Sequence, residues 1–437
     1  MAVARVGSAL GTGRHGVPGG VEFGRSPPMC GFPMSRSILH ARKAGADGMS
    51  SSRDPMHVRR AVLVVAVAAA AVVGSCTRPT PEPVVDDVSA EISSDLDILF
   101  DAVDPNRRVR AVLVHHEGRP VLERYTGAVA DDYWDVQSVG KSVMSALLGI
   151  AIEQGDLEGV DQTLAELLPD HADAMAPGVS AVTLDELLSH TAGFAADLPR
   201  IEDEAVWSSP DWVRYVLADA GPDPTVDEPF AYSSAAAHLM APILVEATGQ
   251  SVLQYARTEL FDPLGISTEP AAEPVAIPVN GTWDPDFLEA YYAADFAWPV
   301  DPQGYHIGAG SLRLRPQDLA KLGQAYLDGG QWQGEQVVPS SWVEQSTDAH
   351  AEVTKVAFAD AYGFMWWLTE YDGSAAFQAM GFGGQVIAVV PDRDLVIVMA
   401  TELDFRDPML STEEIRPDVV AEMIGRYIVP HFDPRST

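Results

Sequence analysis

The feature that most constrains the fold is strand-like sequence near both ends of the folded part of the chain. Residues 108–127 read RVRAVLVHHEGRPVLERYTG, two β-type runs around a turn at Glu117-Gly118-Arg119. Residues 383–402 read GGQVIAVVPDRDLVIVMATE and repeat this pattern around residues 391–394. Both patterns are typical of β-hairpins. Because hairpins join antiparallel strands, the sequence predicts one antiparallel sheet assembled from both ends.

Helical patterns fill the region between the two hairpins, and one more follows the second. Thr183 is a helix-capping residue type, and Pro316 is the type favoured at a first helical position. The predicted helices cover residues 141–154, 183–194, 235–248, 251–260, 316–327 and 416–428. We therefore predict an α+β fold, with helices inserted between the two parts of an antiparallel sheet.

Residues 56–76 read MHVRRAVLVVAVAAAAVVGSC and are typical of a bacterial lipoprotein signal peptide. Arg59 and Arg60 precede an apolar run, residues 61–73, that is shorter than the roughly 20 residues of a membrane span. The closing VGSC resembles a lipobox, in which Cys76 would be lipidated. An uncleaved signal anchor is the alternative. The sequence thus predicts an exported protein, membrane-anchored and facing the cell envelope or the outside.

The remaining N-terminal residues divide into two segments. Residues 1–55 are rich in Gly, Arg, Ser and Pro without periodicity, and we interpret them as a disordered extension or the product of a start codon placed too early. Residues 77–92 begin with TRPTPEPVVDD and predict a Pro-rich tether. Residues 93–437 then read as one continuous folded domain.

Charge and residue usage exclude several classes of partner. Acidic residues outnumber basic ones by 63 to 28, for a net charge of −35, so nucleic acid is not an expected partner. Membrane contact is expected only through Cys76. His115 and His116 lie on a predicted strand, and the sequence has only two cysteines and no His-Glu-x-x-His motif. We therefore expect no metal and no organic cofactor; the oligomeric state stays open.

Ser138 and Lys141 are the strongest candidates for chemistry. The chain has only four lysines, and Lys141 alone has a serine three positions upstream. Residues three apart share a helix face, and the unpaired N–H groups of a helix N-terminus can receive an oxyanion. Burial at that positive end would lower the pKa of Lys141 enough for it to take the proton of Ser138. The alternative is a capping serine followed by a solvated lysine.

Two further motifs lie downstream in the sequence. FAYSSAAAHLM, residues 230–240, places Tyr232 and Ser234 just before a predicted helix, where a tyrosine beside a neutral lysine could relay protons. MGFGGQVIAVV, residues 380–390, leads two glycines into an apolar run. If that run were an edge strand, the N–H of Gln385 could be a second oxyanion donor. The alternatives are a core tyrosine and a simple hairpin bend.

In this order the three motifs resemble those of the beta-lactamase-related serine hydrolases. That family includes class C beta-lactamases, D-alanyl-D-alanine carboxypeptidases, family VIII carboxylesterases and 6-aminohexanoate-dimer hydrolases. The resemblance covers about residues 108–401 and extends to LLSHTAGF (187–194), GYHIGAGSLRLRPQDLAKLG (304–323) and YGFMWW (362–367). It implies a five-stranded type of antiparallel sheet, flanked by helices, plus a helical subdomain.

The resemblance also implies a role for each motif residue. Ser138 would be the nucleophile and Lys141 the general base, with Tyr232 assisting proton transfer. The N–H groups of Ser138 and Gln385 would form the oxyanion hole. By their places in the second and third motifs, the implied substrate-binding residues are Ser234, Phe382, Gly383 and Gly384.

Two departures from the penicillin-recognising members narrow the activity. Those members carry Lys-Thr-Gly in the third motif, whose cation binds the substrate carboxylate, whereas this chain has Phe382-Gly383-Gly384. Ser234 stands where they usually carry Asn. We therefore predict an esterase or amidase that acts through a Ser138 acyl-enzyme, most similar to the 6-aminohexanoate-dimer hydrolase branch. A D-alanyl-D-alanine carboxypeptidase or beta-lactamase, and a catalytically silent surface-binding lipoprotein, remain the alternatives.

Other histidines and aromatic residues receive weaker assignments. His190 and His306 are interpreted as structural, although His306 could also line the pocket. The segments 206–215 and 283–298 are rich in aromatic and acidic residues and include Trp298. They predict either a roof over an aromatic acyl pocket, suited to neutral or amine-bearing substrates, or ordinary packing between helices.

Overall fold

The computed structural model describes residues 85–103, 108–194, 206, 208–219, 230–269, 276–277, 284–407 and 415–435. All of them belong to one compact unit, Pro79–Thr437. The predicted signal peptide and Cys76 lie outside the described residues. None of the described helices has the length and apolar character needed to cross a membrane.

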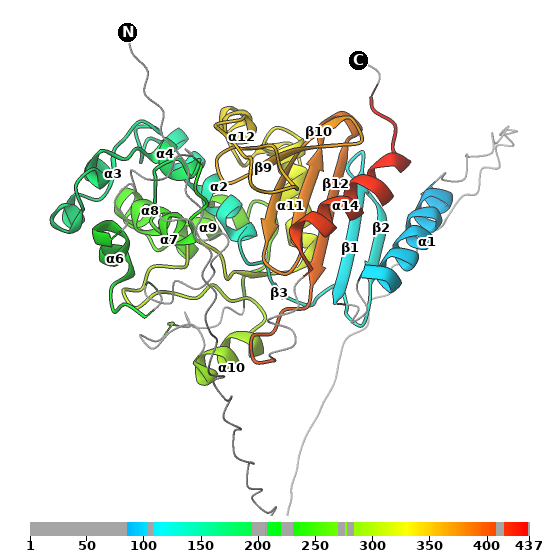
Figure 1. The fold of residues 1–437 in the computed structure, drawn as a ribbon, viewed down its shortest axis with the longest axis horizontal. Helices are drawn as coiled ribbons and strands as arrows, with labels where there is room; N and C mark the ends of the chain where they lie inside the picture. Colours follow the sequence, from blue (N-terminus) through cyan, green and yellow to red (C-terminus); the bar gives the residue numbers. More distant parts are fainter. Residues whose placement is uncertain are drawn as a thin grey trace, which may run out of the picture. The chain divides into compact units, whose positions relative to one another are not determined.

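One antiparallel sheet joins the two ends of the described chain, as predicted (Figure 1). Strand β1 (Val109–His116) pairs on one side with β2 (Arg119–Tyr125) and on the other with β12 (Leu395–Thr401). The sheet continues through β11 (Gln385–Val390), β10 (Ser374–Gly381), β9 (Trp367–Tyr371), β8 (Ala361–Tyr362) and β7 (Ala351–Glu352). It therefore has eight described strands rather than five, and β7 and β8 are short extensions at one edge.

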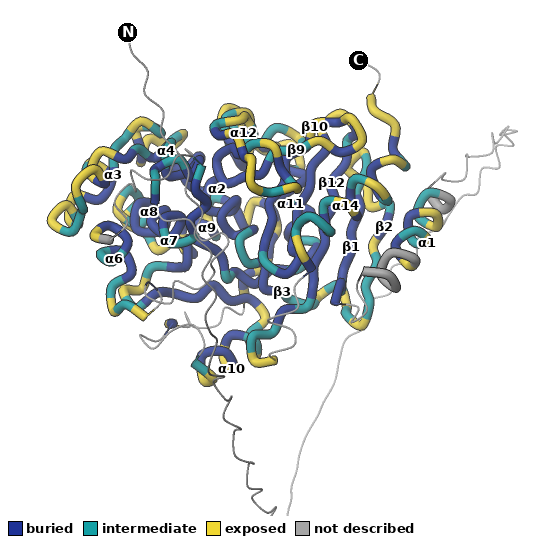
Figure 2. Tube along the Cα trace, in the orientation of Figure 1, coloured by how far each residue is buried: buried dark blue, intermediate teal, exposed yellow. Residues whose placement is uncertain are grey.

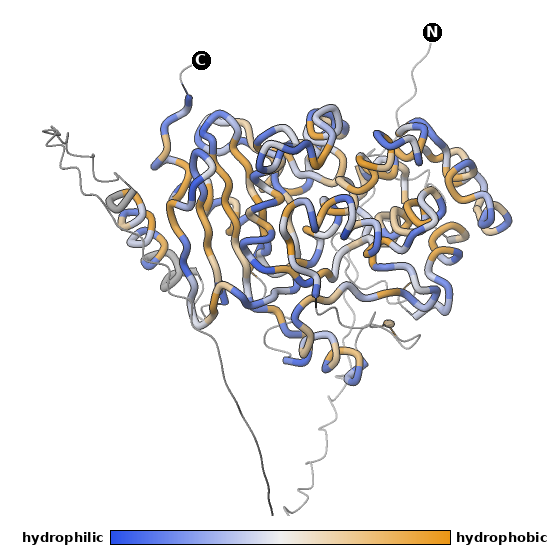
Figure 3. Tube along the Cα trace, turned by 180° about the vertical axis from the view of Figure 1, so that it is seen from behind, coloured by the Kyte–Doolittle hydropathy of each residue, from blue (hydrophilic) through white to orange (hydrophobic). Residues whose placement is uncertain are grey.

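Helices cover both faces of this sheet, so its central strands are buried (Figure 2). Ile387 and Val389 of β11 pack in one core with α2 (Val139–Gln154) and α11 (Pro316–Leu327). Val386, Ala388 and Val390, which alternate with them, pack in a second core with α1 (Val85–Val103) and α14 (Pro417–Tyr427). A strand buried on both faces reads as a continuous apolar run, and Figure 3 shows the sheet in predominantly hydrophobic colours.

The helical region lies beside the sheet (Figure 1). Its helices are α3 (Leu164–Leu167), α4 (Leu184–Leu188), α6 (Trp212–Asp219), α7 (Ser234–His238), α8 (Met240–Thr248), α9 (Val252–Ala256), α10 (Pro285–Ala293) and α12 (Ser340–Thr347). Short helical turns are Pro169–Ala174, Val179–Ala181, Arg257–Phe261, Pro391–Arg393 and Val429–His431. Two small ribbons pair β3 (Trp134–Asp135) with β4 (Arg313–Leu314), and β5 (Gln331–Trp332) with β6 (Glu335–Gln336).

Two sequence predictions need correction. Residues 235–248 do not form one helix, because α7 ends at His238 and α8 begins at Met240. Pro242 explains the break: a proline cannot donate to the carbonyl four residues earlier, and its ring clashes with that carbonyl. The predicted tether is also too long, because α1 begins at Val85 and Ile92 is fully buried. The folded domain therefore starts inside the Pro-rich segment.

Candidate active site

Ser138 and Lys141 lie together at the start of the buried central helix α2. Ser138 is the N-cap residue, but its side chain makes no capping hydrogen bond. Lys141 is 1% exposed, and its Nζ lies 2.9 Å from Ser138 Oγ. The alternative of a capping serine and a solvated lysine is therefore wrong. A buried amine in hydrogen-bonding contact with a hydroxyl at a helix N-terminus is a geometry suited to nucleophile activation.

A strained turn presents Ser138. Gln137, the preceding residue, has φ 50°, which is unfavourable for a residue with a side chain. The Asp135 carboxylate holds this turn, because it accepts hydrogen bonds from Gln137 N at 3.0 Å and from Gln137 Nε2 at 2.6 Å. Burial raises the pKa of Asp135, while these bonds and the nearby Arg313 act in the opposite direction. Asp135 thus holds the turn that precedes Ser138, a contact that the sequence pattern did not indicate.

Ser234 and Tyr232 approach Lys141 from a segment about ninety residues downstream. Ser234 Oγ lies 3.1 Å from Lys141 Nζ, and the centroid of the Tyr232 ring lies 5.0 Å from it. Tyr232 stacks on Trp367 of β9 with ring centroids 5.2 Å apart. As predicted, both residues lie at the start of a helix, α7, whose N-cap Ser233 accepts a hydrogen bond from Ala236 N.

His190 holds the Tyr232 segment in place. Its Nδ1 accepts a hydrogen bond from Ser233 N at 3.4 Å, and its carbonyl accepts one from Ala231 N at 2.8 Å. Burial is the main cause that holds the pKa of His190 well below 6.5, and a cationic Lys141 would lower it further. The imidazole is therefore neutral at physiological pH and acts as an acceptor toward the second motif.

The third motif forms the tip of the β10–β11 hairpin. Gly381 pairs with Gln385, and Phe382, Gly383 and Gly384 make the turn. A Cβ added at Gly381 would lie 2.4 Å from Val136 O, so this hairpin packs directly against the turn that carries Ser138. The structure thereby brings the third motif next to Ser138, although β11 is an interior strand and not the edge strand that the sequence suggested.

Backbone conformation and contacts within the protein explain why glycine occupies positions 383 and 384 of the third motif. Gly383 and Gly384 have φ of 79° and 95°, and a Cβ on Gly383 would lie 2.6 Å from Leu403. The Gln385 side chain donates to the carbonyl and hydroxyl of Thr401, whose hydroxyl in turn donates to the Gly383 carbonyl. Phe382 is half-buried and stacks on Phe405 at 6.2 Å. Phe382 thus makes apolar contacts at the position where penicillin-recognising enzymes carry the lysine of Lys-Thr-Gly.

The aromatic segments predicted to roof a pocket pack instead in the core where they are described. Trp298 is 3% exposed, and its indole N–H donates to Ile307 O at 3.0 Å. Trp212 is fully buried against His238. His306 is also buried, packs edge-on against Trp298, and has a pKa lowered to about 4, mainly by burial. The ordinary-packing alternative therefore holds for these residues.

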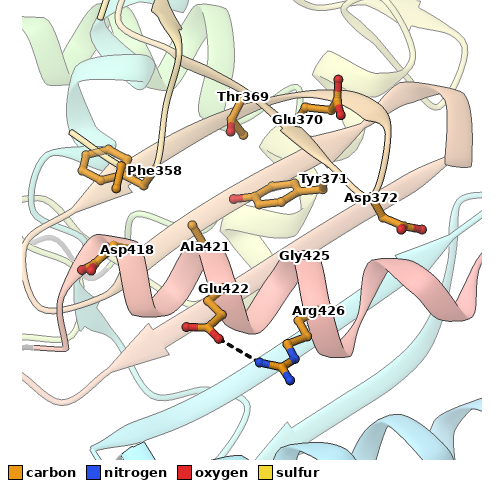
Figure 4. Close-up of a pocket in the computed structure, with 11 residues that line it drawn as sticks. Phe358, Thr369, Glu370, Tyr371, Asp372, Asp418, Ala421, Glu422, Gly425 and Arg426 are labelled. Atoms are coloured by element: carbon orange, nitrogen blue, oxygen red, sulfur yellow. Dashed lines mark hydrogen bonds and ion pairs between the residues drawn. The ribbon is translucent and has the colours of Figure 1, made fainter. Parts of the chain in front are cut away.

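A shallow groove of about 400 Å³ lies elsewhere, between β9 and α14 (Figure 4). Phe358, Glu370 and Tyr371 line one side, and Glu422 and Arg426 of α14, which form an ion pair, lie on the other. The lining includes none of the predicted site residues. Within the described ranges, no group of His, Cys, Asp or Glu side chains is arranged to hold a metal ion.

One further contact could not be read from residue types. The carbonyl oxygen of Ala309 lies 2.6 Å from Lys141 Nζ. The adjacent Gly310 packs tightly against the turn that carries Ser138, because a Cβ there would lie 2.6 Å from Gln137 O. The motif GYHIGAG hinted at this region through its glycines, but the acceptor is a main-chain atom whose role depends on the tertiary fold.

Comparison with known proteins identifies the family. A family model described as Beta-lactamase matches residues 101–418. The chain belongs to the beta-lactamase family. Members of this family are serine hydrolases, among them esterases, amidases and penicillin-binding proteins, so the predicted family and hydrolase class are confirmed.

Individual relatives span several activities within the beta-lactamase family. Penicillin-binding protein 4 of Amycolatopsis lactamdurans is 32% identical over 160 residues, which cover 35% of this chain and only 40% of that protein. The 6-aminohexanoate-dimer hydrolase of Paenarthrobacter ureafaciens is 24% identical over 302 residues, 64% of this chain and 69% of that protein.

The fold is also shared with solved structures. The crystal structure of a penicillin-binding protein homologue from Caulobacter crescentus superposes with a TM-score of 0.54 at 19% identity, covering 72% of this chain and 91% of that one. This likeness supports the predicted α+β, beta-lactamase-like fold.

Proposed function

We propose that this protein hydrolyses an ester or amide bond through an acyl-enzyme on Ser138. The observation that carries the proposal is the buried contact of 2.9 Å between Ser138 Oγ and Lys141 Nζ at the N-terminus of α2. Ser138 Oγ attacks the substrate carbonyl carbon while its proton moves to Lys141. The bond to the leaving group then breaks, and water attacks the acyl-enzyme to release the acid.

Tyr232 and the backbone complete the proposed machinery. Tyr232, packed beside Lys141, assists delivery of the proton to the leaving group. The N–H groups of Ser138 and Gln385 stabilise the oxyanion; the first lies at a helix N-terminus and the second at the start of a strand beside the nucleophile turn. Apart from the hydrolytic water, the proposed steps use side chains and main-chain groups of the chain itself.

The third motif favours an esterase or amidase over a penicillin-recognising enzyme. Phe382, stacked on Phe405, replaces the cation that binds a substrate carboxylate in those enzymes. The rival activity, a D-alanyl-D-alanine carboxypeptidase or beta-lactamase, is favoured by the relationship to penicillin-binding protein 4. A panel of p-nitrophenyl esters, short amide oligomers and nitrocefin, assayed with wild type and Ser138→Ala, separates the two.

We expect Ser138-dependent turnover of esters or amides and little turnover of nitrocefin. Rapid nitrocefin hydrolysis would favour the rival activity instead. A fluorophosphonate probe gives an independent readout, because it labels an activated serine irrespective of the substrate. If wild type stayed unlabelled and inert, the protein would be better described as a silent binding lipoprotein, and the proposal would fail.

We further propose that the protein is exported and anchored through a lipid on Cys76. The support is the signal-peptide pattern of residues 56–76, which ends in VGSC. Metabolic labelling with an alkyne-tagged fatty acid is expected to mark wild type and not Cys76→Ser. Equal labelling of the two proteins would refute the anchor.

A further inference from the structure

A buried histidine–aspartate pair lies at the far end of the helix that carries Ser234. His238 closes α7, and its Nε2 lies 3.0 Å from Oδ2 of Asp301. Both side chains are fully buried. Burying a carboxylate is costly unless it is well paired, and Asp301 also accepts hydrogen bonds from the main-chain N–H groups of Gln303 and Tyr305, at 2.8 and 2.9 Å.

The other imidazole nitrogen fixes which tautomer is present. Nδ1 of His238 accepts a hydrogen bond from Gly308 N at 3.3 Å. Because Nδ1 is the acceptor, Nε2 carries the proton and donates it to Asp301. The pair therefore joins the C-terminus of α7 to two points of the segment 301–308.

This segment continues directly into the catalytic centre. Gly308 packs so closely on α7 that an added Cβ would lie 3.0 Å from Ala237 O. Gly310 packs as closely on the turn before Ser138. Between these two tight contacts, the Ala309 carbonyl faces Lys141 Nζ at 2.6 Å. We therefore expect a shift of Gly308 to move the Ala309 carbonyl that Lys141 contacts.

We infer that His238 and Asp301 are positioning residues that hold the Ala309 carbonyl so that Lys141 presents its lone pair to Ser138. The inference rests on the proposed function and deepens it. A neutral amine has two N–H donors and one lone pair, and a carbonyl oxygen can only accept. With one N–H directed to Ala309 O and the other to Ser234 Oγ, the lone pair is left for the Ser138 hydroxyl.

The first test is Asp301→Asn, which preserves shape but places an amide NH₂ opposite His238. If this group faces Nε2, the imidazole proton must move to Nδ1, where it meets the N–H of Gly308. We expect kcat for p-nitrophenyl acetate to fall about 10- to 100-fold while KM changes less than about threefold, because a base displaced by about an ångström loses its alignment. His238→Gln is the second variant and is expected to behave alike, because an amide placed to donate to Asp301 has no acceptor at the position of Nδ1, where Gly308 N donates.

A double-mutant comparison separates positioning from general damage. In a Lys141→Met background, Asp301→Asn is expected to change the residual rate less than about twofold, because the base that it positions is gone. Tyr371→Phe removes a buried hydrogen bond to Gln378 elsewhere in the sheet and serves as the matched control, with kcat expected to stay at the wild-type value.

The outcomes distinguish failure of the positioning role of His238 and Asp301 from failure of the proposed hydrolase function. Equal losses in the wild-type and Lys141→Met backgrounds, or an unchanged kcat in both variants, would overturn the positioning role alone. Absence of Ser138-dependent turnover in wild type would instead overturn the proposed function and the positioning role together. Melting temperatures of all variants identify any that fail to fold.

Discussion

Replacing Lys141 with methionine tests the centre of the proposed mechanism. Methionine keeps an unbranched side chain of similar length but has no amine. The change removes the contacts of Nζ with Ser138 Oγ at 2.9 Å, Ser234 Oγ at 3.1 Å and Ala309 O at 2.6 Å. At this buried position, where Lys141 is 1% exposed, we expect little void because the flexible methionine side chain is of similar size.

The expected effects on rate and on stability have opposite signs. A positioned general base contributes about 10²- to 10⁴-fold, or about 3–5 kcal/mol of transition-state stabilisation. We expect kcat/KM to fall by that factor. Leaving the Ala309 carbonyl without its donor costs about 1–3 kcal/mol. Removing the buried neutral amine saves its own desolvation cost, about 2–7 kcal/mol for a neutral polar group taken out of water. We therefore expect the melting temperature to be no lower than that of wild type.

The assay combines p-nitrophenyl butyrate hydrolysis with the rate of fluorophosphonate labelling, so that acylation is observed directly. Lys321→Met is the control, because Lys321 is a partly exposed lysine that contacts Asp318 and Gly265 and lies outside the proposed machinery. Its rates are expected to match wild type. A Lys141→Met enzyme within about tenfold of wild-type kcat/KM would refute the assignment of Lys141 as the base.

Two further predictions concern backbone fit and pH. Gly310→Ala and Gly159→Ala both place a side chain at extreme positive φ, 150° and 154°, but only the Cβ at Gly310 meets another atom, Gln137 O at 2.6 Å. We expect Gly310→Ala to lower kcat at least tenfold and Gly159→Ala to leave it unchanged; equal effects would contradict this reading. The second prediction concerns His306, whose folded-state pKa of about 4 lies below the unfolded value of 6.5. The unfolded chain therefore takes up the proton first, and up to about 3 kcal/mol of unfolding free energy is lost as pH falls from about 6.5 to about 4. Chemical denaturation across this range should show a flatter profile for His306→Phe, and identical profiles would refute the assignment.

Much of the fold could be predicted because its signals are local. Both hairpins, the helix after Ser138 and the helix beginning at Pro316 follow from periodicity and turn residues, and all four are present. The helix break at Leu239 was missed because residues 235–248 are apolar throughout, so the constraint imposed by Pro242 was outweighed by the pattern. The early start of α1 was missed because the Pro-rich sequence before Val85 suggested a longer tether.

In the candidate site, too, the local contacts could be predicted from the sequence and the tertiary contacts could not. Ser138 and Lys141 are three residues apart on one helix, so their contact is a local property that spacing predicts. The Ala309 carbonyl contacts Lys141 only because tertiary packing brings the two together. The His238–Asp301 pair supports that carbonyl and is likewise formed by tertiary packing. A main-chain acceptor carries no residue-type signature, and a buried histidine among alanines reads as core until its partner is known.

The pairing of β1 with β12 has a consequence for biogenesis. These neighbouring strands lie near opposite ends of the domain, so the centre of the sheet cannot close until almost the entire chain has been made. During synthesis, one edge of the first hairpin stays unpaired until β12 has been made, and an unpaired strand edge is prone to aggregation. Truncating the chain before Leu395 would remove the strand that this edge awaits, and holdase-type chaperones should bind such a fragment far more strongly than the full-length protein.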